Sequence, residues 1–144
     1  MPMIDIHAPA GTFGDVHALA TAAAATVMRI EAVPDIGMFR ENTAAFVREL
    51  PPEAISDVNG GSGHIRVQVL TNAGALDRDK QLAVVEQLTA LVVEAAGDPS
   101  WERKTWVLLT EAAPGGWGLW GHAHTNEELV GAARAEIAAL QGAG

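Results

Sequence analysis

The chain has 144 residues, of which 49% are hydrophobic, enough apolar material for one domain with its own core. Its formal net charge of −9 and its lack of Lys/Arg clusters argue against nucleic-acid binding, which needs a basic surface to neutralise phosphates. No apolar run reaches the roughly 20 residues that cross a bilayer, so no membrane association is expected. Because the chain has no cysteine, disulfides, cysteine-rich zinc sites and thiol catalysis are excluded. The first residues lack a signal-peptide pattern, so a cytoplasmic location is expected.

In chain order, the first predicted element is a short strand over residues 2–7. Thr12 and Asp15 resemble the capping box that starts a helix, with aspartate in place of the usual glutamate. Apolar residues then recur at helical spacing, and Pro34 ends the helix because proline disfavours helical geometry in the residue before it. A second strand is predicted over residues 44–50.

The second half of the chain has the same succession of elements. A strand is predicted over residues 64–70, followed by a helix that Asp77 caps and Gly97 ends. A further strand is predicted over residues 105–110. The glycine-rich run over residues 59–63 lacks the strand-to-helix context of a phosphate loop and is interpreted as the connection between the halves.

An internal repeat supports this organisation. Moving the sequence along itself by 63 positions aligns Gly11 with Gly74 and Asp35 with Asp98. Each unit of strand, helix and strand predicts a parallel pair of strands joined by a helical crossover. Two such units predict an α+β fold with one four-stranded sheet and two helices on one face.

The predicted domain covers residues 1–121, with units at about 2–60 and 64–121. Thr125 begins a T-x-x-E pattern that predicts a last helix. Residues 122–144 are therefore expected to form a C-terminal helical extension of the same domain.

Two separated segments resemble the tautomerase superfamily. Residues 2–11 read PMIDIHAPAG, with proline directly after the initiator methionine, and resemble the start of 4-oxalocrotonate tautomerase. Residues 106–121 read WVLLTEAAPGGWGLWG and resemble the second strand and glycine-rich hairpin of the same enzyme. The resemblance implies two fused β-α-β units, as in malonate semialdehyde decarboxylase and cis-3-chloroacrylic acid dehalogenase, and a homotrimer that covers the bare sheet face.

The resemblance further implies that Pro2 is the catalytic residue once Met1 has been removed. Inside a chain the proline nitrogen is an amide, whereas at the amino terminus it is a secondary amine that can accept or donate a proton. An α-amino group titrates at about pH 8, and burial in an apolar pocket lowers the pKa of an ammonium toward neutrality, where proton transfer is efficient. The alternative is that Pro2 merely begins an edge strand, where proline is tolerated.

Trp117 matches the position of the family's pocket aromatic, and the resemblance implies an apolar wall that excludes water. Core packing is the alternative role for this side chain. The arginines with which the family binds carboxylates are missing from their usual positions, which hold Thr12, Ala75 and Trp106.

A dry pocket cannot hold a carboxylate without a compensating cation, so Arg40 and Arg66 are the candidates to replace the missing arginines. Arg66 is predicted on the third strand, beside the first, and His64 shares its face by alternation and is a further candidate for substrate binding. Arg40 is predicted in the loop after the first helix. Either arginine could instead form a salt bridge between subunits.

The sequence therefore predicts a Pro2-dependent tautomerase-type enzyme that moves a proton between oxygen and carbon of a small enol or 2-oxo compound. The alternatives are hydration, dehalogenation or decarboxylation of a three-carbon acid by a protonated Pro2, and a trimeric binding protein without catalysis. No cofactor is expected. His122 and His124 could suggest two metal ligands, but no third ligand accompanies them and no metal site is expected.

Overall fold

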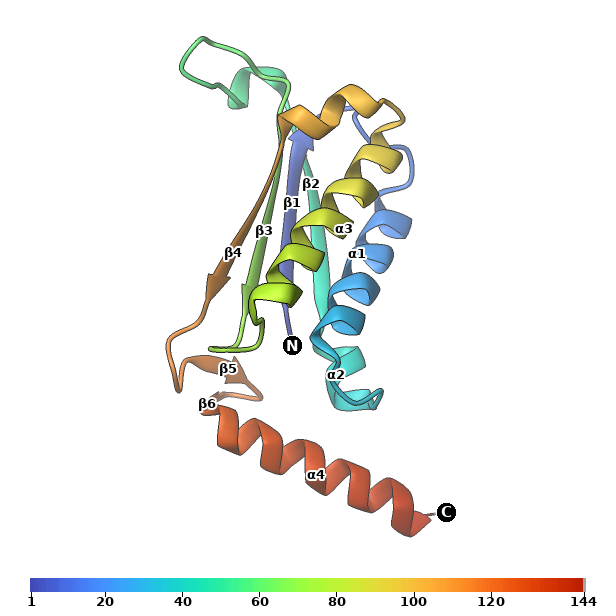
Figure 1. Cartoon of the computed structure of the whole chain (residues 1–144), viewed down its shortest axis with the longest axis vertical. Coiled ribbons are helices and arrows are strands. Elements are labelled where there is room, and N and C mark those ends of the chain that lie inside the picture. The colour runs from blue at the N-terminus through green and yellow to red at the C-terminus, as the bar shows by residue number, and fades with distance from the viewer. Residues whose placement is uncertain (144) are drawn as a thin grey trace.

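Four strands form one mixed sheet in the order β2-β1-β3-β4 (Figure 1). β1 runs parallel to β2 and antiparallel to β3, and β3 runs parallel to β4. Each half of the chain thus contributes one parallel pair, and β1 and β3 join the halves at the centre. The computed structural model describes residues 1–143, and its strands are β1 (Met3–Pro9), β2 (Ala44–Leu50), β3 (Ile65–Thr71) and β4 (Thr105–Glu111).

Two long helices, α1 (Val16–Glu31) and α3 (Arg78–Ala96), lie together on one face of the sheet (Figure 1). Each helix connects the two strands of a parallel pair, which makes each half a β-α-β unit. The arrangement confirms the predicted α+β fold with both helices on one face.

The start of α1 differs from the predicted capping box. The side chain of Asp15 accepts a hydrogen bond from the N–H of Ala18 at 3.0 Å, which makes Asp15 the N-cap. The hydroxyl of Thr12 instead donates to the carbonyl of Pro9 at 2.6 Å. Thr12 therefore stabilises the turn that leaves β1, and the helix begins at Val16.

The predicted signals at the ends of α3 are confirmed. The carboxylate of Asp77 accepts a hydrogen bond from the N–H of Lys80 at 2.9 Å. Gly97 ends the helix in the left-handed conformation, with φ of 73°. α1 ends before Pro34, as predicted, but its left-handed C-cap is Ala32, with φ of 61°.

The main core lies between the sheet and the two helices. In the two central strands every second side chain is buried, which is the period of a strand with one covered face. Burial of each large aliphatic side chain contributes about 1.5–3 kcal/mol. The strands supply Ile4, Ile6, Ala8, Ile65, Val67 and Val69, and the helices supply Leu19, Ala23, Val27, Val84, Leu88 and Val92.

Within residues 1–143, no layer covers the opposite face of the sheet (Figure 1). Phe46 on β2 is 59% exposed, and Trp106 and Leu108 on β4 are 47% and 45% exposed. Large apolar side chains gathered on one exposed face are typical of a surface that binds another protein.

The C-terminal part lies beyond one end of the sheet (Figure 1). A short hairpin, β5 (Trp117–Leu119) and β6 (His122–His124), leads into α4 (Asn126–Ala143). The N–H of Glu128 donates to the hydroxyl of Thr125 at 3.2 Å, and the N–H of Thr125 donates to the Glu128 carboxylate at 3.4 Å. These two bonds form the predicted capping box, so the C-terminal helix is confirmed.

Three short elements were not predicted: α2 (Gly37–Glu41) and the 3₁₀ helices η1 (Pro52–Ala54) and η2 (Pro99–Lys104). Each is too short to show a helical period in the sequence. The division of the chain into a domain and an extension remains a prediction. Among the helices of residues 1–143, none combines the length and the apolar character that crossing a membrane requires.

Candidate active site

The amino terminus lies inside the protein, at the end of the sheet where β1 begins. Met1 is only 1% exposed, and Pro2 is also buried. The carbonyl of Pro2 accepts a hydrogen bond from the N–H of Ala44 at 3.3 Å, which extends the pairing of β1 with β2 by one step. The first two residues are therefore fixed by the sheet.

The side chain of Met1 packs in a second apolar cluster, separate from the main core. This cluster, whose interior the Met1 side chain fills, joins α2, the β5-β6 hairpin and α4, three elements that meet below the end of the sheet (Figure 1), and we call it the terminal pocket. Its buried residues are Met1, Ile36, Met38, Phe39, Trp117, Leu129 and Ala133.

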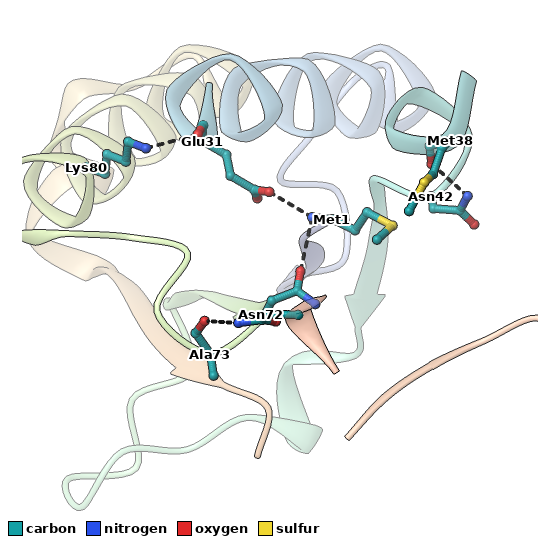
Figure 2. A network of polar contacts seen from close by, with 8 residues as sticks. Met1, Glu31, Met38, Asn42, Asn72, Ala73 and Lys80 are labelled. Carbon is teal, nitrogen blue, oxygen red and sulfur yellow. Dashed lines mark hydrogen bonds and ion pairs between the residues drawn. The ribbon is translucent and has the colours of Figure 1, made fainter. Parts of the chain in front are cut away.

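Two polar side chains hold the terminal ammonium in this apolar setting (Figure 2). The ammonium of Met1 donates to Oε1 of Glu31 at 2.9 Å and to Oδ1 of Asn72 at 3.3 Å. The Glu31 side chain is only 6% exposed. Glu31 is the last residue of α1, and Asn72 directly follows β3. One residue from each β-α-β unit thus binds the amino terminus.

Three polar atoms at this end of the sheet are buried without a hydrogen-bond partner among the described residues. They are Oε2 of Glu31, Nδ2 of Asn72 and Oγ1 of Thr43, the residue before β2. Most buried polar atoms in proteins are hydrogen-bonded, and each unsatisfied one costs about 1–3 kcal/mol. Two of these atoms belong to the side chains that bind the terminal ammonium, and Thr43 lines a cavity together with Met28, Arg29 and Arg40.

Helix α4 is fastened across the terminal pocket at two places. At its start, Nδ2 of Asn126 donates to the carbonyl of Ala73 at 2.8 Å. Further along, the carboxylate of Glu136 accepts a hydrogen bond from the N–H of Met38 at 3.1 Å. Between these contacts Leu129 and the neighbouring helical turn face the cluster. α4 therefore closes the pocket on the side away from the sheet.

A cation lies at the end of α1. Lys80 Nζ donates to the main-chain carbonyl of Glu31 at 3.0 Å (Figure 2). A cation at this position satisfies one of the carbonyls that remain free at a helix C-terminus. It also links α1 to α3 beside the terminal pocket.

Trp117 is brought to the amino terminus. Its side chain is 7% exposed and belongs to the same cluster as Met1. The hairpin that carries it is 115 positions from Pro2 in the sequence, counted as 117 minus 2. The fold thus brings Trp117 into one cluster with Met1, the residue before Pro2, and the catalytic roles of Pro2 and Trp117 remain predictions.

Arg66 lies far from Pro2 within one chain. It pairs with His7 in the sheet and projects from the uncovered face, where it is exposed. Met3, which follows Pro2, pairs with Leu70, and Leu70 lies about four residues, or 13 Å, from Arg66 along β3.

His64 is close to Arg66 but is engaged with other groups. Its Nε2 lies 2.9 Å from Oδ2 of Asp57, and its ring stacks on Trp106 with 4.7 Å between centroids. Neither His64 nor Arg66 is near the Pro2 of its own chain. Their role in substrate binding remains a prediction, and it requires the amino terminus of a second subunit.

Arg40, on α2, lines a cavity beside α1 together with Met28, Arg29 and Thr43. It pairs with Asp35 at 2.7 Å, and the two side chains are 65% and 74% exposed. The hydrogen bond that Arg40 donates to the Asp35 carboxylate raises the pKa of Arg40 above its usual value. Its neighbours Met38 and Phe39 take the inward side of the helix. Arg40 as a substrate-binding residue therefore also remains a prediction.

The histidines of β6 form no metal-ligand group. Nε2 of His122 lies 2.8 Å from Oε2 of Glu128, and this contact is the main cause of a lowered pKa at Glu128. Within residues 1–143 no three histidine, aspartate or glutamate side chains are arranged to hold a metal ion.

The sequence analysis missed Glu31, Asn72 and Thr43 as site residues. A signal for Glu31 was present, because it continues the buried stripe of α1 at a spacing of four. The stripe consists of Leu19, Ala23, Val27 and Glu31. A charged residue on the apolar stripe of a helix is rarely buried without a partner. Asn72 and Thr43 gave no comparable signal.

The sequence of the chain matches no protein-family model and no curated protein. Its structure is similar to a fused 4-OT symmetric trimer, with a TM-score of 0.69 and 18% identity over 83% of this chain and 93% of the other.

It is also similar to N1, a member of the cis-3-chloroacrylic acid dehalogenase family, with a TM-score of 0.68 and 17% identity over 89% of this chain and 88% of the other. A third similar structure is Pt0534 inactivated by 2-oxo-3-pentynoate, with a TM-score of 0.72 and 16% identity over 88% and 98% of the two chains. The chain therefore has the fused tautomerase fold.

Proposed function

We propose that the protein is a tautomerase-type enzyme in which Pro2, freed by removal of Met1, transfers a proton between oxygen and carbon of a small enol or carbonyl compound. The observation that supports it most strongly is the buried ammonium of Met1, held by Glu31 and Asn72 at the edge of an apolar pocket. Removal of Met1 makes the secondary amine of Pro2 the new terminus in this place. The similarity of the fold to fused 4-OT supports the same reaction class.

Met1 itself occupies the space that a substrate requires. Its side chain is buried against Met38, Phe39 and Trp117. When Met1 is removed, these side chains form the wall of a space next to the amine of Pro2. The chain that keeps Met1 is expected to be inactive for two reasons, because the pocket is filled and because the Pro2 nitrogen is an amide.

The proton transfer can be written as a closed cycle. The neutral amine of Pro2 removes the O–H proton of an enol, and the resulting enolate carbon then takes a proton from the Pro2 ammonium to give the ketone. Pro2 is neutral again at the end, so no other reactant is consumed. Trp117 and Phe39 keep water away, which strengthens the electrostatic interactions with the enolate.

Hydration, dehalogenation or decarboxylation of a three-carbon acid is the second candidate. The carboxylate of Glu31 binds the ammonium of Met1, and after removal of Met1 it would favour the protonated form of a nearby Pro2 amine, which these reactions need. However, such a substrate carries a carboxylate, and within one chain Arg40 is paired with Asp35 while Arg66 lies on the uncovered sheet face. We therefore place the tautomerase reaction first.

We also propose that the protein is a homotrimer. The uncovered sheet face exposes Phe46, Trp106 and Leu108, and the similar fused 4-OT structure is described as a trimer. Covering this face would bury apolar surface that a monomer leaves in water.

The first experiment is an intact-mass measurement followed by an assay. Loss of Met1 exposes the amine, whereas full retention of Met1 contradicts the proposal. The processed protein is then compared with its Pro2→Ala variant, which keeps a primary amine at the terminus. The assay follows the ketonisation of two enols, that of a phenylpyruvate ester and that of phenylpyruvic acid. A loss of kcat in Pro2→Ala supports the proposal, and equal rates indicate a binding protein without this catalysis.

A further inference from the structure

We propose that the cavity between α1 and β2 is a second binding site, which takes an amphiphilic carboxylate with its charged end at Arg29 and Arg40 and its alkyl chain along α1. This α1–β2 cavity has a volume of about 680 Å³, within the usual range of sites that hold a small molecule. Met1, Pro2 and Trp117 lie outside its lining. The inference therefore goes beyond the proposed function and does not depend on it.

One face of α1 forms the long wall of the cavity. The helical residues that line it follow the i, i+3, i+4 spacing of a single face, and this face differs from the buried stripe that packs on the sheet. At 1.5 Å per residue, the wall from His17 to Arg29 is about 18 Å long. Its residues are His17, Ala20, Thr21, Ala24, Ala25, Met28 and Arg29.

The two arginines lie at the same end of this wall. The helix of a β-α-β unit runs antiparallel to its strands, so the C-terminal end of α1 lies beside the start of β2. Arg29 is in the last turn of α1, and Arg40 is in α2, shortly before β2 begins at Ala44. With Asp35 as the one carboxylate of the lining, this end of the cavity is positively charged, although the whole chain has a net charge of −9.

Both guanidinium groups have donors left for a ligand. Nη2 of Arg29 donates to Oε1 of Gln87, a neutral amide, at 3.0 Å, and among residues 1–143 Arg29 forms no ion pair. Arg40 binds Asp35, but both side chains are exposed, and exposed pairs of this kind are weak. Because a guanidinium has several N–H groups in a planar fork, each arginine can bind a carboxylate of the ligand in addition.

The rest of the lining suits an amphiphile. Thr43, at the arginine end, is 8% exposed, and its hydroxyl has no partner among the described residues. A buried hydroxyl without a partner is unfavourable, and a ligand oxygen at this end can accept its hydrogen bond. Away from the arginines, alanines form most of the wall, and burial of this apolar surface drives the binding of an alkyl chain.

The cavity adjoins the terminal pocket without opening into it. Met28 and Val33 line the cavity, and both also pack against the cluster that contains Met1. A ligand in the α1–β2 cavity therefore contacts the outer side of residues that support the proposed active site.

The test measures the binding of octanoate, butanoate and 1-octanol by calorimetry at pH 7.5. The protein is the chain that keeps Met1, in which the Met1 side chain fills the terminal pocket. We expect octanoate to bind at least about tenfold more tightly than butanoate, which lacks four methylene groups, and than 1-octanol, which lacks the charge; tenfold corresponds to 1.4 kcal/mol. No measurable binding of octanoate, or equal binding of 1-octanol, overturns the proposal.

Three variants assign the carboxylate to named residues. R29Q and R40Q are each expected to weaken octanoate severalfold and to leave 1-octanol unchanged, which shows that the cavity is intact. D35N is expected to strengthen octanoate, because it removes the carboxylate that competes for Arg40. The matched control is R103Q, since Arg103 stands 63 positions after Arg40 in the internal repeat and is exposed outside the cavity. Unchanged octanoate affinity in both R29Q and R40Q overturns the site.

Two outcomes separate this inference from the proposed function. If octanoate binds the chain that keeps Met1 and shifts the amide resonances of Ala24 and Thr43, but Pro2→Ala ketonises enols at the native rate, the proposed function fails and the second site stands. If octanoate binds only the protein from which Met1 has been removed, it occupies the terminal pocket, and the second site is ruled out while the proposed function is unaffected.

Discussion

Oε1 of Glu31 lies 2.9 Å from the terminal nitrogen of Met1, and this contact links the end of α1 to the beginning of β1. The two residues form a buried ion pair, since their side chains are 6% and 1% exposed. Breaking a buried pair by removing one partner leaves an uncompensated charge, which costs about 3–5 kcal/mol.

In the chain that keeps Met1, we therefore expect Glu31→Leu to lower the free energy of unfolding by about 3 kcal/mol, because the terminal ammonium stays buried without its counter-charge. The measurement is urea denaturation, with Glu94→Leu as the exposed control at the equivalent position of α3. The free energy of unfolding of Glu94→Leu is expected to stay within about 0.5 kcal/mol of the unsubstituted value. Equal changes in both variants would show that Glu31 does not stabilise the amino terminus.

Removal of Met1 should also change stability. The Met1 side chain fills the terminal pocket, so its loss is comparable to a Met→Ala change in a core, which costs about 2–5 kcal/mol. We expect the processed protein to unfold at a lower temperature than the chain with Met1, and a bound ligand to restore stability by mass action. The measurement is calorimetry on both forms; a processed form that is equally stable would mean that the pocket collapses.

The two aromatic positions of the hairpin region should respond differently to truncation. Trp117 is 7% exposed in the terminal pocket, whereas Trp120 is 65% exposed. Trp117→Ala is expected to cost about 3 kcal/mol and to lower Pro2-dependent turnover, because it opens the pocket to water. Trp120→Ala is the control and should stay within about 0.5 kcal/mol. Equal losses of turnover would remove Trp117 from the site.

A charge introduced on the uncovered sheet face should dissociate the proposed trimer. Phe46→Asp places a carboxylate where the proposed trimer buries an aromatic ring, so we expect the variant to be monomeric. Val58→Asp is the control, because Val58 is exposed in the connection between the two units. Light scattering with size-exclusion chromatography gives the mass of each variant. A trimer that survives Phe46→Asp would place the interface on another surface.

The elements of the fold could be predicted because their signals are local. The alternation of buried and less buried side chains in β3 and the capping aspartate before α3 each extend over only a few residues of sequence. α2 could not be predicted, since five residues do not complete two helical turns. The position of Trp117 in the pocket came from a resemblance, because nothing in its own neighbourhood indicates it.

The polar part of the candidate site depends on long-range contacts. Met1 meets Glu31 at a separation of 30 residues and Asn72 at a separation of 71. No local pattern encodes such a meeting, which requires both β-α-β units to be in place. For the same reason the sequence suggested Arg40 and Arg66 by charge alone, and the fold of one chain pairs Arg40 with Asp35 and places Arg66 on the uncovered sheet face.

The loop before β3 should open in acid. The carboxylate of Asp57 accepts hydrogen bonds from the N–H of Gly61 and of Asn59, each at 2.8 Å, and contacts Nε2 of His64 at 2.9 Å. The N–H of Gly61, followed by the His64 side chain, lowers the pKa of Asp57 below its usual value. A carboxylate with a lowered pKa stabilises the folded loop above its unfolded pKa of about 3.9, and this contribution is lost as the pH falls through the folded value.

We therefore expect the Gly61 amide resonance and the fluorescence of Trp106, on which His64 stacks, to change together as the pH is lowered below about 4. Asp57→Asn should remove this transition, because an amide side chain does not titrate in that range. Asp98→Asn is the matched control: the pKa of Asp98 is also lowered, but by the N–H of Ser100 in another loop, so the Asp57 transition should persist. A transition that survives in Asp57→Asn would assign it to a different carboxylate.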